Sequence, residues 1–457
     1  MKTALYATYK NSNSQWLGDI PNHWEVKKLK FLAVVQPSNV DKKTVEGEEP
    51  VLLCNYTDVY KNEYIDGRLD FMRATATNDE IKKFAVDIGD VIVTKDSETP
   101  DDIAIPACVA EKIEGLLCGY HLTQIKPVDL AGRYLFRLFQ STGFSAQFTV
   151  AANGVTRFGL PQYAIANAFS PVPPIDEQKA IAQFLDYKTA QIDALIAKKE
   201  ALLTKLAEKR TALISHAVTK GLDPSVPMKD SGVEWLGEVP EHWTMTRLKY
   251  ATSMIVDCPH ETPQYSIDGD YFVIRTADLS LGLMDLSNAY RLDEAEYCKR
   301  TRRALVKPGD ILYGREGERW GFAATVPASP RICLGQRMMQ FRTAQHFDAR
   351  FLMWHINADC VYQQGSLDVA GSTAPHVNVE TIKNYWLVAP RYDEQEAIAK
   401  YLDDATKRIE NQAVAIKKAI SRLQEYRSAL ITNAVTGKID VRNFPMPGST
   451  SKEVRHA

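Results

Sequence analysis

The chain has 457 residues, of which 45% are hydrophobic, so it is long enough for two or three globular domains, each with its own core. Its 55 lysines and arginines nearly balance 57 aspartates and glutamates. Net charge therefore does not by itself indicate a nucleic-acid partner, and any basic surface must be local. No apolar run reaches about eighteen residues, and the N-terminus lacks the apolar core of a signal peptide. We expect a cytoplasmic protein.

The cysteines are scattered and form no Cys-x-x-Cys pair, so their spacing predicts neither zinc ligands nor a redox pair. We expect most of them to be buried as small hydrophobic side chains. The sequence offers no cluster of metal ligands, and we predict no metal site. The cysteines are Cys54, Cys108, Cys118, Cys258, Cys298, Cys333 and Cys360.

The sequence contains a tandem duplication. Residues 16–31 (WLGDIPNHWEVKKLKF) return at 235–250 as WLGEVPEHWTMTRLKY, so that Trp16 corresponds to Trp235 (235 − 16 = 219). Residues 173–186 (PPIDEQKAIAQFLD) return at 389–403 as APRYDEQEAIAKYLD, so that Asp176 corresponds to Asp393 (393 − 176 = 217). The borders of the two copies match while their interiors diverge, which predicts one scaffold carrying two different binding surfaces.

Each copy begins with a module of mixed secondary structure. Residues 134–140 and 350–356 are predicted to be short buried helices. We expect His23 and His242 of the repeated border to pack in the core or in a turn, because neither has a carboxylate or a cysteine nearby in the sequence. Short β-rich runs are separated by Gly, Pro, Asp and Asn, which is typical of an α+β module. Such runs occur at Val51–Leu53, Val91–Thr94, Tyr271–Ile274 and Ile311–Tyr313.

A long amphipathic helix is predicted after each module. From about Asp176 to Val218, and again from Asp393, apolar residues recur with helical spacing and no Pro or Gly interrupts them. About 40 residues at about 1.5 Å each give a helix of about 60 Å, whose apolar stripe needs a partner. A seven-residue grid, broken in the first helix by Lys199, predicts that the two helices pack as an antiparallel coiled coil. The alternative is that each helix folds back on its own module.

The predicted subunit-interface residues are the members of this grid. They are Leu185, Ile192, Leu206, Leu213, Leu402, Ile409, Ile416, Leu423 and Leu430.

The domain boundaries follow from the repeat. In the tail we expect mostly flexible chain, with its first residues packing back near the N-terminal arm. The predicted segments are a first module at 10–174, a first helix at 175–220, a linker and second module at 221–391, a second helix at 392–437 and a tail at 438–457.

Several motifs occur in the same order in both copies: the Trp-Leu-Gly border, the helix that begins with Asp-Glu-Gln, and the helix endings LISHAVTKG and LITNAVTGK. In this combination the chain resembles, over essentially its whole length, the specificity subunit of type I restriction-modification systems. The resemblance implies that residues 10–174 and 229–391 are target-recognition domains, each of which reads one half of a bipartite, asymmetric DNA sequence. It also implies that the helices set the half-site spacing and dock two methyltransferase subunits.

The same resemblance implies which components lie outside this chain. In that family, separate restriction subunits perform ATP-driven translocation and cleavage. S-adenosylmethionine, ATP and Mg are expected on partner subunits, and no cofactor is expected on this chain. The sequence agrees, since it contains neither a Walker A pattern nor an NPPY-like adenine-methylase motif. We therefore predict a protein that is not an enzyme and has no catalytic residues.

Two loops of each module hold the candidate DNA contacts. The segment GREGERWG (314–321) corresponds to the stretch that begins at Lys95, and NGVTRFG (153–159) aligns with AGSTAPH (370–376). Forked side chains suit base edges, and basic or hydroxyl groups suit phosphates. An ordinary solvated loop is an equally good interpretation of each residue. The candidates are Lys95, Ser97, Thr156, Arg157, Arg315, Glu316, Arg319, Thr373 and His376.

Two other classes of function stay open at this point. One is an autonomous nuclease or methyltransferase fused to its own DNA reader, which is disfavoured because both copies are accounted for without a catalytic domain. The other is a coiled-coil scaffold or adaptor protein without DNA recognition.

Overall fold

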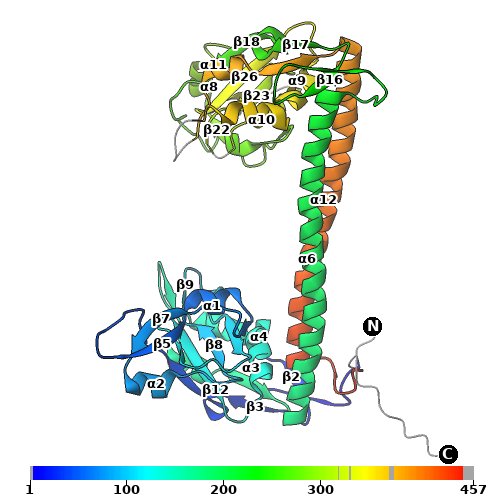
Figure 1. Ribbon diagram of the computed structural model, residues 1–457. Coiled ribbons are helices and arrows are strands. Elements are labelled where there is room, and N and C mark those ends of the chain that lie inside the picture. Colours follow the sequence, from blue (N-terminus) through cyan, green and yellow to red (C-terminus); the bar gives the residue numbers. More distant parts are fainter. Residues whose placement is uncertain (1–3, 318, 329–330, 370–374, 446–457) are drawn as a thin grey trace, which may run out of the picture. The chain divides into compact units, whose positions relative to one another are not determined.

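The computed structural model describes residues 4–317, 319–328, 331–369 and 375–445 (Figure 1). The chain divides into two compact units: unit 1 comprises residues 1–199 and 418–457, and unit 2 comprises residues 200–417. Each unit holds one mixed α+β module together with part of two long helices, α6 (Ile175–Lys220) and α12 (Tyr392–Val435). The predicted fold class, α+β modules each followed by a long helix, is confirmed.

The module of unit 1 combines short strands with short helices. Its strands are β1 (Tyr9–Asn11), β2 (Asp19–Pro21), β3 (Glu25–Lys28), β4 (Ala33–Pro37), β5 (Glu49–Cys54), β6 (Tyr64–Ile65), β7 (Met72–Ala76), β8 (Val91–Thr94), β9 (Asp96–Ser97), β10 (Pro106–Val109), β11 (Leu116–Cys118), β12 (Leu122–Pro127), β13 (Phe158–Gly159) and β14 (Phe169–Val172). Its helices are η1 (Leu29–Phe31), α1 (Tyr56–Lys61), α2 (Asn78–Phe84), α3 (Gly132–Phe139), α4 (Thr142–Ala151) and α5 (Gln162–Ala166).

A five-stranded sheet with the order β4-β12-β8-β10-β6 forms the centre of this module. Its neighbours are antiparallel except for β10 and β6, which are parallel. β8 is the middle strand and is buried along its whole length, which explains the unbroken apolar run at Val91–Thr94. The module also has a smaller sheet, β11-β5-β7, and the strand predicted at Val51–Leu53 is part of β5.

Unit 2 repeats this plan. Its strands are β15 (Met228–Asp230), β16 (Glu238–Pro240), β17 (Thr244–Arg247), β18 (Thr252–Asp257), β19 (Tyr271–Ile274), β20 (Leu279–Ser280), β21 (Leu283–Met284), β22 (Tyr290–Leu292), β23 (Ile311–Gly314), β24 (Ala323–Thr325), β25 (Ile332–Leu334), β26 (Met338–Thr343) and β27 (Trp386–Ala389). Its helices are α7 (Leu248–Ala251), η2 (Thr276–Asp278), α8 (Glu294–Arg300), α9 (Ala349–Ile356), α10 (Asp359–Ser366) and α11 (Val379–Lys383).

The main sheet of unit 2 has the order β18-β26-β23-β24, and a smaller sheet has the order β22-β19-β25. β23 corresponds to β8 of unit 1, and its apolar run is again fully buried. The short buried helices that the sequence predicts near residues 134–140 and 350–356 are α3 and α9. The sequence pattern therefore predicted, in each module, a strand that lies inside the main sheet and a short buried helix that follows it in the chain.

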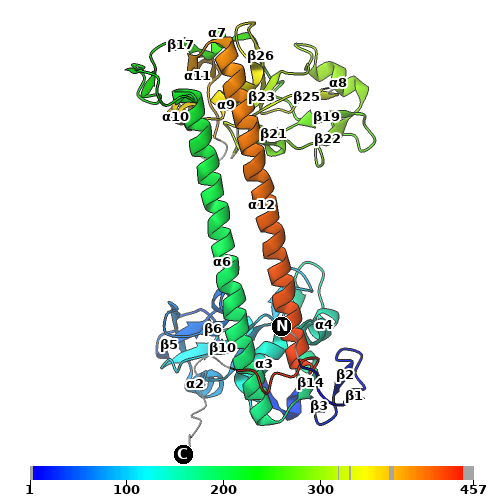
Figure 2. The same cartoon turned by 90° about the vertical axis from the view of Figure 1, so that its right-hand side faces the viewer.

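The two long helices pack against each other and against the module in both units. In unit 1, Leu185 near the start of α6 shares a core with Leu430 near the end of α12. In unit 2, Val218 near the end of α6 shares a core with Leu402 near the start of α12. The start of one helix thus meets the end of the other, so the helices are antiparallel, as predicted (Figure 2).

The members of the seven-residue grid differ in exposure. Leu185 and Leu402 are completely buried within their own units, so neither presents surface to another subunit. Leu185 and Leu402 are therefore core residues of this chain, and not the subunit-interface residues that the sequence predicted. Ile192, Ile409 and Leu430 are 6–8% exposed. The half-buried members are Leu206, Leu213, Ile416 and Leu423, for which an interface with other subunits stays a prediction.

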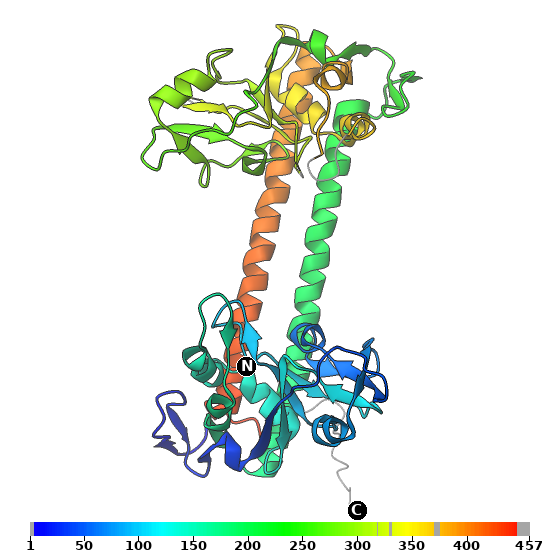
Figure 3. The same ribbon diagram turned by 90° about the vertical axis from the view of Figure 1, so that its left-hand side faces the viewer.

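Unit 1 is completed by the segment that follows α12. The backbone of Asp440 bridges to Ala4, and the Lys438 ammonium donates a hydrogen bond to the backbone carbonyl of Asp19. The Phe444 ring packs edge-on against Phe184 of α6, with ring centroids 4.8 Å apart. Figure 3 shows the dark blue N-terminal arm beside the red end of α12. The first residues of the tail therefore pack near the N-terminal arm, as predicted.

The boundary between the compact units falls inside the helices, between residues 199 and 200 and between residues 417 and 418. The predicted division into separate modules, helices and tail therefore stays a prediction. No helix in the described part of the chain combines the length and hydropathy needed to cross a membrane. The cysteines are free thiols, and all except Cys298 are buried, as expected.

Candidate functional site

The two candidate loops of the first module meet. β9, which directly follows Lys95, pairs with β13, so that Gly159 lies opposite Asp96. The next backbone amide, Leu160 N–H, donates to the Lys95 carbonyl at 2.7 Å. Two segments that are distant in the sequence thus form one surface.

The corresponding loops of the second module meet in the same way. Glu316 forms a backbone bridge with His376, and Val377 N–H donates to the Arg315 carbonyl at 3.4 Å. Glu316 corresponds to Asp96 (316 − 96 = 220), and His376 corresponds to Gly159 (376 − 159 = 217). The duplication therefore extends to the backbone contacts of the candidate site, although the side chains differ.

A third segment joins this surface in each module, and it was not predicted from the sequence. In unit 1, Lys95 N–H donates to the His121 carbonyl at 3.1 Å, and in unit 2, Arg315 N–H donates to the Arg337 carbonyl at 3.0 Å. We call residues 119–121 and 335–337 the third segments. Each contains a glycine and two further residues, Tyr120 and His121 or Gln336 and Arg337.

The glycines of the third segments are required by a close backbone approach. A Cβ on Gly119 would lie 2.5 Å from the Cys54 carbonyl oxygen, and a Cβ on Gly335 would lie 2.7 Å from that of Ile274. Each glycine amide also donates to that same carbonyl oxygen, at 2.9 and 2.8 Å. The signal that could have found these segments is a glycine that recurs, close to the repeat spacing, directly after a short apolar run (335 − 119 = 216).

In unit 1, most charges of the site are neutralised within the protein. The Asp96 carboxylate lies 2.6 Å from both the Arg157 guanidinium and the His121 ring, and the guanidinium is the more exposed partner. The Lys95 ammonium donates to the Ser38 carbonyl at 2.9 Å and lies 4.4 Å from the Tyr120 ring centroid. Burial lowers the pKa of Lys95.

The candidate residues of unit 1 therefore divide into two groups. Thr156 and Arg157 are exposed, as a contact with a ligand requires. Ser97 is only 7% exposed, and its hydroxyl accepts a hydrogen bond from the Thr99 amide at 3.4 Å. Ser97 is therefore buried and stabilises the loop by this hydrogen bond, contrary to the prediction that it faces a ligand.

In unit 2, Arg315 is enclosed. Its side chain is 11% exposed, and its guanidinium pairs with Asp257 at 3.1 Å and with Glu316. Arg319 is exposed and donates one hydrogen bond, at 3.1 Å, to the Ala277 carbonyl. His376 is half-buried, and Thr373 lies outside the described residues.

Asp257, Cys258 and His260 lie close enough to suggest a metal site, since their ligand atoms are within 4.8 Å of one another. Two observations argue against one. The Arg315 guanidinium already occupies the Asp257 carboxylate. Burial also raises the pKa of Cys258 to about 11, so a metal would have to displace a proton from a buried thiol.

The repeated border motifs anchor each module to the start of its long helix. Glu177 of α6 accepts hydrogen bonds from Trp24 at 3.0 Å and from Tyr6, and it pairs with His23 at 2.8 Å. In unit 2, Glu394 pairs with His242 at 3.1 Å. Both histidines are exposed and lie in turns, so the expected position in a turn is confirmed and packing in the core is not. Their carboxylate partners were not foreseen, because they lie far away along the chain.

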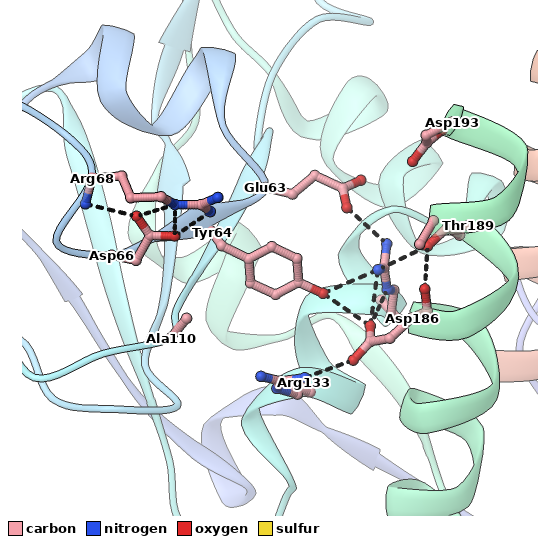
Figure 4. Close-up of a pocket in the computed structure, with 11 residues that line it drawn as sticks. Glu63, Tyr64, Asp66, Arg68, Ala110, Arg133, Asp186, Thr189 and Asp193 are labelled. Atoms are coloured by element: carbon pink, nitrogen blue, oxygen red, sulfur yellow. Dashed lines mark hydrogen bonds and ion pairs between the residues drawn. The ribbon is translucent and has the colours of Figure 1, made fainter. Parts of the chain in front are cut away.

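A polar cavity of about 430 Å³ lies where the module of unit 1 meets α6 (Figure 4). Arg137, whose side chain is 1% exposed, reaches it and pairs with Asp186 at 2.9 Å and with Glu63 at 3.2 Å. Burial alone would raise the pKa of Glu63, but the guanidinium groups of Arg137 and Arg427 hold it below its ordinary value. The acidic groups of this cavity therefore pair with arginines of the protein itself, and these ion pairs hold the module against the helices.

Comparison with known proteins adds independent support. Residues 259–422 match the family model of the type I restriction modification DNA specificity domain. The type I restriction enzyme MjaVIII specificity subunit of Methanocaldococcus jannaschii is 21% identical over 93% of this chain and 95% of its own length.

Two solved structures share the fold. A chain from a study of assembly and conformational transition of the type I R-M system matches with a TM-score of 0.69 at 15% identity, over 91% of this chain and 98% of its own. The HsdS subunit from Thermoanaerobacter tengcongensis matches with a TM-score of 0.51 at 15% identity, over 92% and 98%. The chain thus shares the fold of these two proteins, and its residues 259–422 match a type I restriction modification DNA specificity domain. It is similar to type I restriction enzyme specificity subunits over nearly its whole length.

Proposed function

We propose that this chain selects the DNA target of a type I restriction-modification complex, with each unit reading one half of a bipartite, asymmetric sequence. One observation carries the proposal: the same three loop segments meet in both units through equivalent backbone hydrogen bonds but present different side chains. A shared scaffold with different side chains is what two different half-sites require, because bases are read by side chains.

The scaffold alternative without DNA recognition is not favoured, since the chain carries the DNA specificity domain named above. On the proposed function the chain itself is not an enzyme. Modification subunits would dock on the exposed faces of α6 and α12 and supply S-adenosylmethionine chemistry, and restriction subunits would supply the reactions that need ATP and Mg. The near-balance of 55 basic and 57 acidic residues suits a protein whose larger surfaces meet proteins rather than DNA.

A module exchange tests the proposal. The chain is co-expressed with its modification subunits, and methylated adenines are mapped across a genome. We expect one bipartite motif. Replacing residues 229–391 with the module of another specificity subunit should change one half of the motif and keep the other half. A methylation pattern without a bipartite motif, or a motif that survives the exchange intact, would show the proposal to be wrong.

Arg319 provides a prediction about affinity. Its guanidinium is exposed and is paired with no carboxylate among the described residues, so it suits a phosphate. Arg319→Ala should lower the slope of log K against log salt concentration by about 1 and weaken binding to all sequences alike. Fluorescence anisotropy of the modification complex on duplex DNA at several salt concentrations measures this slope. Arg331→Ala, which removes an exposed arginine whose guanidinium lies 3.9 Å from the Asp270 carboxylate, is the charge-matched control.

A further inference from the structure

Arg337 of the third segment has the properties that base reading requires. It lies in the short connection between β25 and β26, and its carbonyl accepts the Arg315 amide, so its backbone is fixed. Its side chain is exposed. One guanidinium nitrogen lies 3.4 Å from the position that a Cβ on Gly317 would take, which places the guanidinium beside the loop predicted to contact DNA.

Two arginines near Arg337, Arg315 and Arg275, already pair with carboxylates of the protein. Arg315 is held by Asp257 and Glu316, and the Arg275 guanidinium pairs with Asp278 at 2.8 Å. Within the described residues, Arg337 makes no ion pair and its side chain makes no hydrogen bond. A guanidinium whose donors are not used within the protein can offer two parallel N–H groups to the O6 and N7 atoms of guanine.

The surroundings of Arg337 also favour a ligand rich in acceptors. It lines a cavity of about 320 Å³, and no aspartate or glutamate is among the described residues that line this cavity. The polar lining consists of Thr262, Tyr265, Arg275, Thr276, Gln336 and Arg337. The polar cavity of unit 1 differs, because its lining contains Glu63, Asp66, Asp186 and Asp193, which pair with the protein's own arginines.

The equivalent position in unit 1 has a different chemistry. There His121 takes the place of Arg337 (337 − 121 = 216), and its ring is held by Asp96 at 2.6 Å. Tyr120 takes the place of Gln336 and lies under the Lys95 ammonium. The third segments therefore differ between the units in both charge and shape, as two readers of different sequences should.

We propose that Arg337 reads a guanine in the half-site of unit 2, that Gln336 contacts the neighbouring base pair, and that Arg315 is a positioning residue that holds their loop. This inference rests on the proposed function and deepens it. It moves the main base contact of unit 2 from Arg315, the candidate from the sequence, to a residue 22 positions further along the chain (337 − 315).

The test uses the complex of the full chain with its modification subunits and a DNA library in which each motif position is varied singly. Arg337→Ala should relax one position of one half-site by about 5- to 150-fold, leaving the other half-site unchanged. Arg337→Lys keeps the charge but loses the fork, so it should relax the same position while nearly keeping affinity. Arg331→Ala is the control, because it removes an exposed arginine from just before β25, at the other end of that strand.

The outcomes separate the two claims. If the wild-type complex methylates no bipartite motif, the proposed function fails and this inference fails with it. If the wild-type motif is bipartite but Arg337→Ala keeps every position, or weakens all sequences equally, only the base-reading role of Arg337 is overturned. Relaxation at the same position by Arg315→Ala, with Arg337→Ala unchanged, would return the role to Arg315. Thermal unfolding of each variant checks that the exposed Arg337 side chain is dispensable for folding.

Discussion

Arg137→Met should lower the unfolding free energy of unit 1 by about 3–5 kcal/mol, because it removes one partner from a buried ion-pair network. The Arg137 guanidinium donates to Asp186, Glu63 and Gln140 and also to Tyr64 and Thr189, and these bonds connect α3 with α6. Methionine fills a similar length but leaves two carboxylates with fewer donors in a region of low dielectric.

Arg133→Ala is the matched control for this prediction. Arg133 donates to the same Asp186 carboxylate at 2.9 Å, but its side chain is 57% exposed. Its loss should cost less than about 1 kcal/mol, as is typical of exposed pairs. Urea unfolding, together with hydrogen exchange of the α3 amides, measures both effects. If the two variants lowered the free energy of unfolding equally, the burial of Arg137 would not be the reason for its effect, and the prediction would be wrong.

The second large effect concerns His355 in unit 2. His355 is fully buried on α9, and neither ring nitrogen has a hydrogen-bond partner among the described residues. Burial lowers its pKa from 6.5 to about 3. In unit 1 the equivalent position is Leu138 (355 − 138 = 217), so His355→Leu places there a side chain that the same scaffold already accommodates.

The sign of the pH effect follows from these pKa values. Between pH 6.5 and about 3 the unfolded chain binds a proton at His355 that the folded chain excludes. The contribution of the neutral histidine to the free energy of unfolding is therefore fully present above pH 6.5. It is lost as the pH falls below 6.5, at about 1.4 kcal/mol per pH unit. At pH 4.5, wild-type unit 2 should have lost about 2–3 kcal/mol through this residue relative to pH 7.5.

His355→Leu should abolish this loss, so the difference in unfolding free energy between variant and wild type should grow as the pH falls. It is measured by urea unfolding at pH 7.5, 6.0 and 4.5. His216→Gln, which removes an exposed histidine of α6 in the same unit, is the control for the loss of a histidine that is not buried. A difference between His355→Leu and wild type that stays constant over this range would contradict the prediction.

The sequence predicted the parts of this protein that depend on local pattern. The β-rich run at Val91–Thr94 indicated a strand, which is β8, and the long apolar grid from Asp176 indicated α6. The repeat located the loops around Lys95 and Arg315 as equivalent positions, and the structure brings each together with its second predicted loop.

Long-range partners were beyond the sequence. No residue close to Arg315 in the sequence indicates that its guanidinium pairs with Asp257, which lies 58 positions earlier. Similarly, His121 and Arg337 join the site through hydrogen bonds of their backbone carbonyls. Backbone contacts of this kind cannot be predicted from the pattern of side chains, and the nearby glycine is the one sign of them in the sequence. The fold class could therefore be predicted. Which residues of the site are exposed and free to contact DNA, and which are enclosed and hold the loops, could not.

The assembly of unit 1 from both ends of the chain has a consequence for biosynthesis. Unit 2 is continuous, from residue 200 to residue 417, so all of its core has been translated before α12 is complete. Unit 1 needs Ile431 and Val435 to cover a core that includes Leu135. During vectorial synthesis, we therefore expect the first-translated module to wait on the ribosome with part of its apolar core uncovered, while the later one matures first.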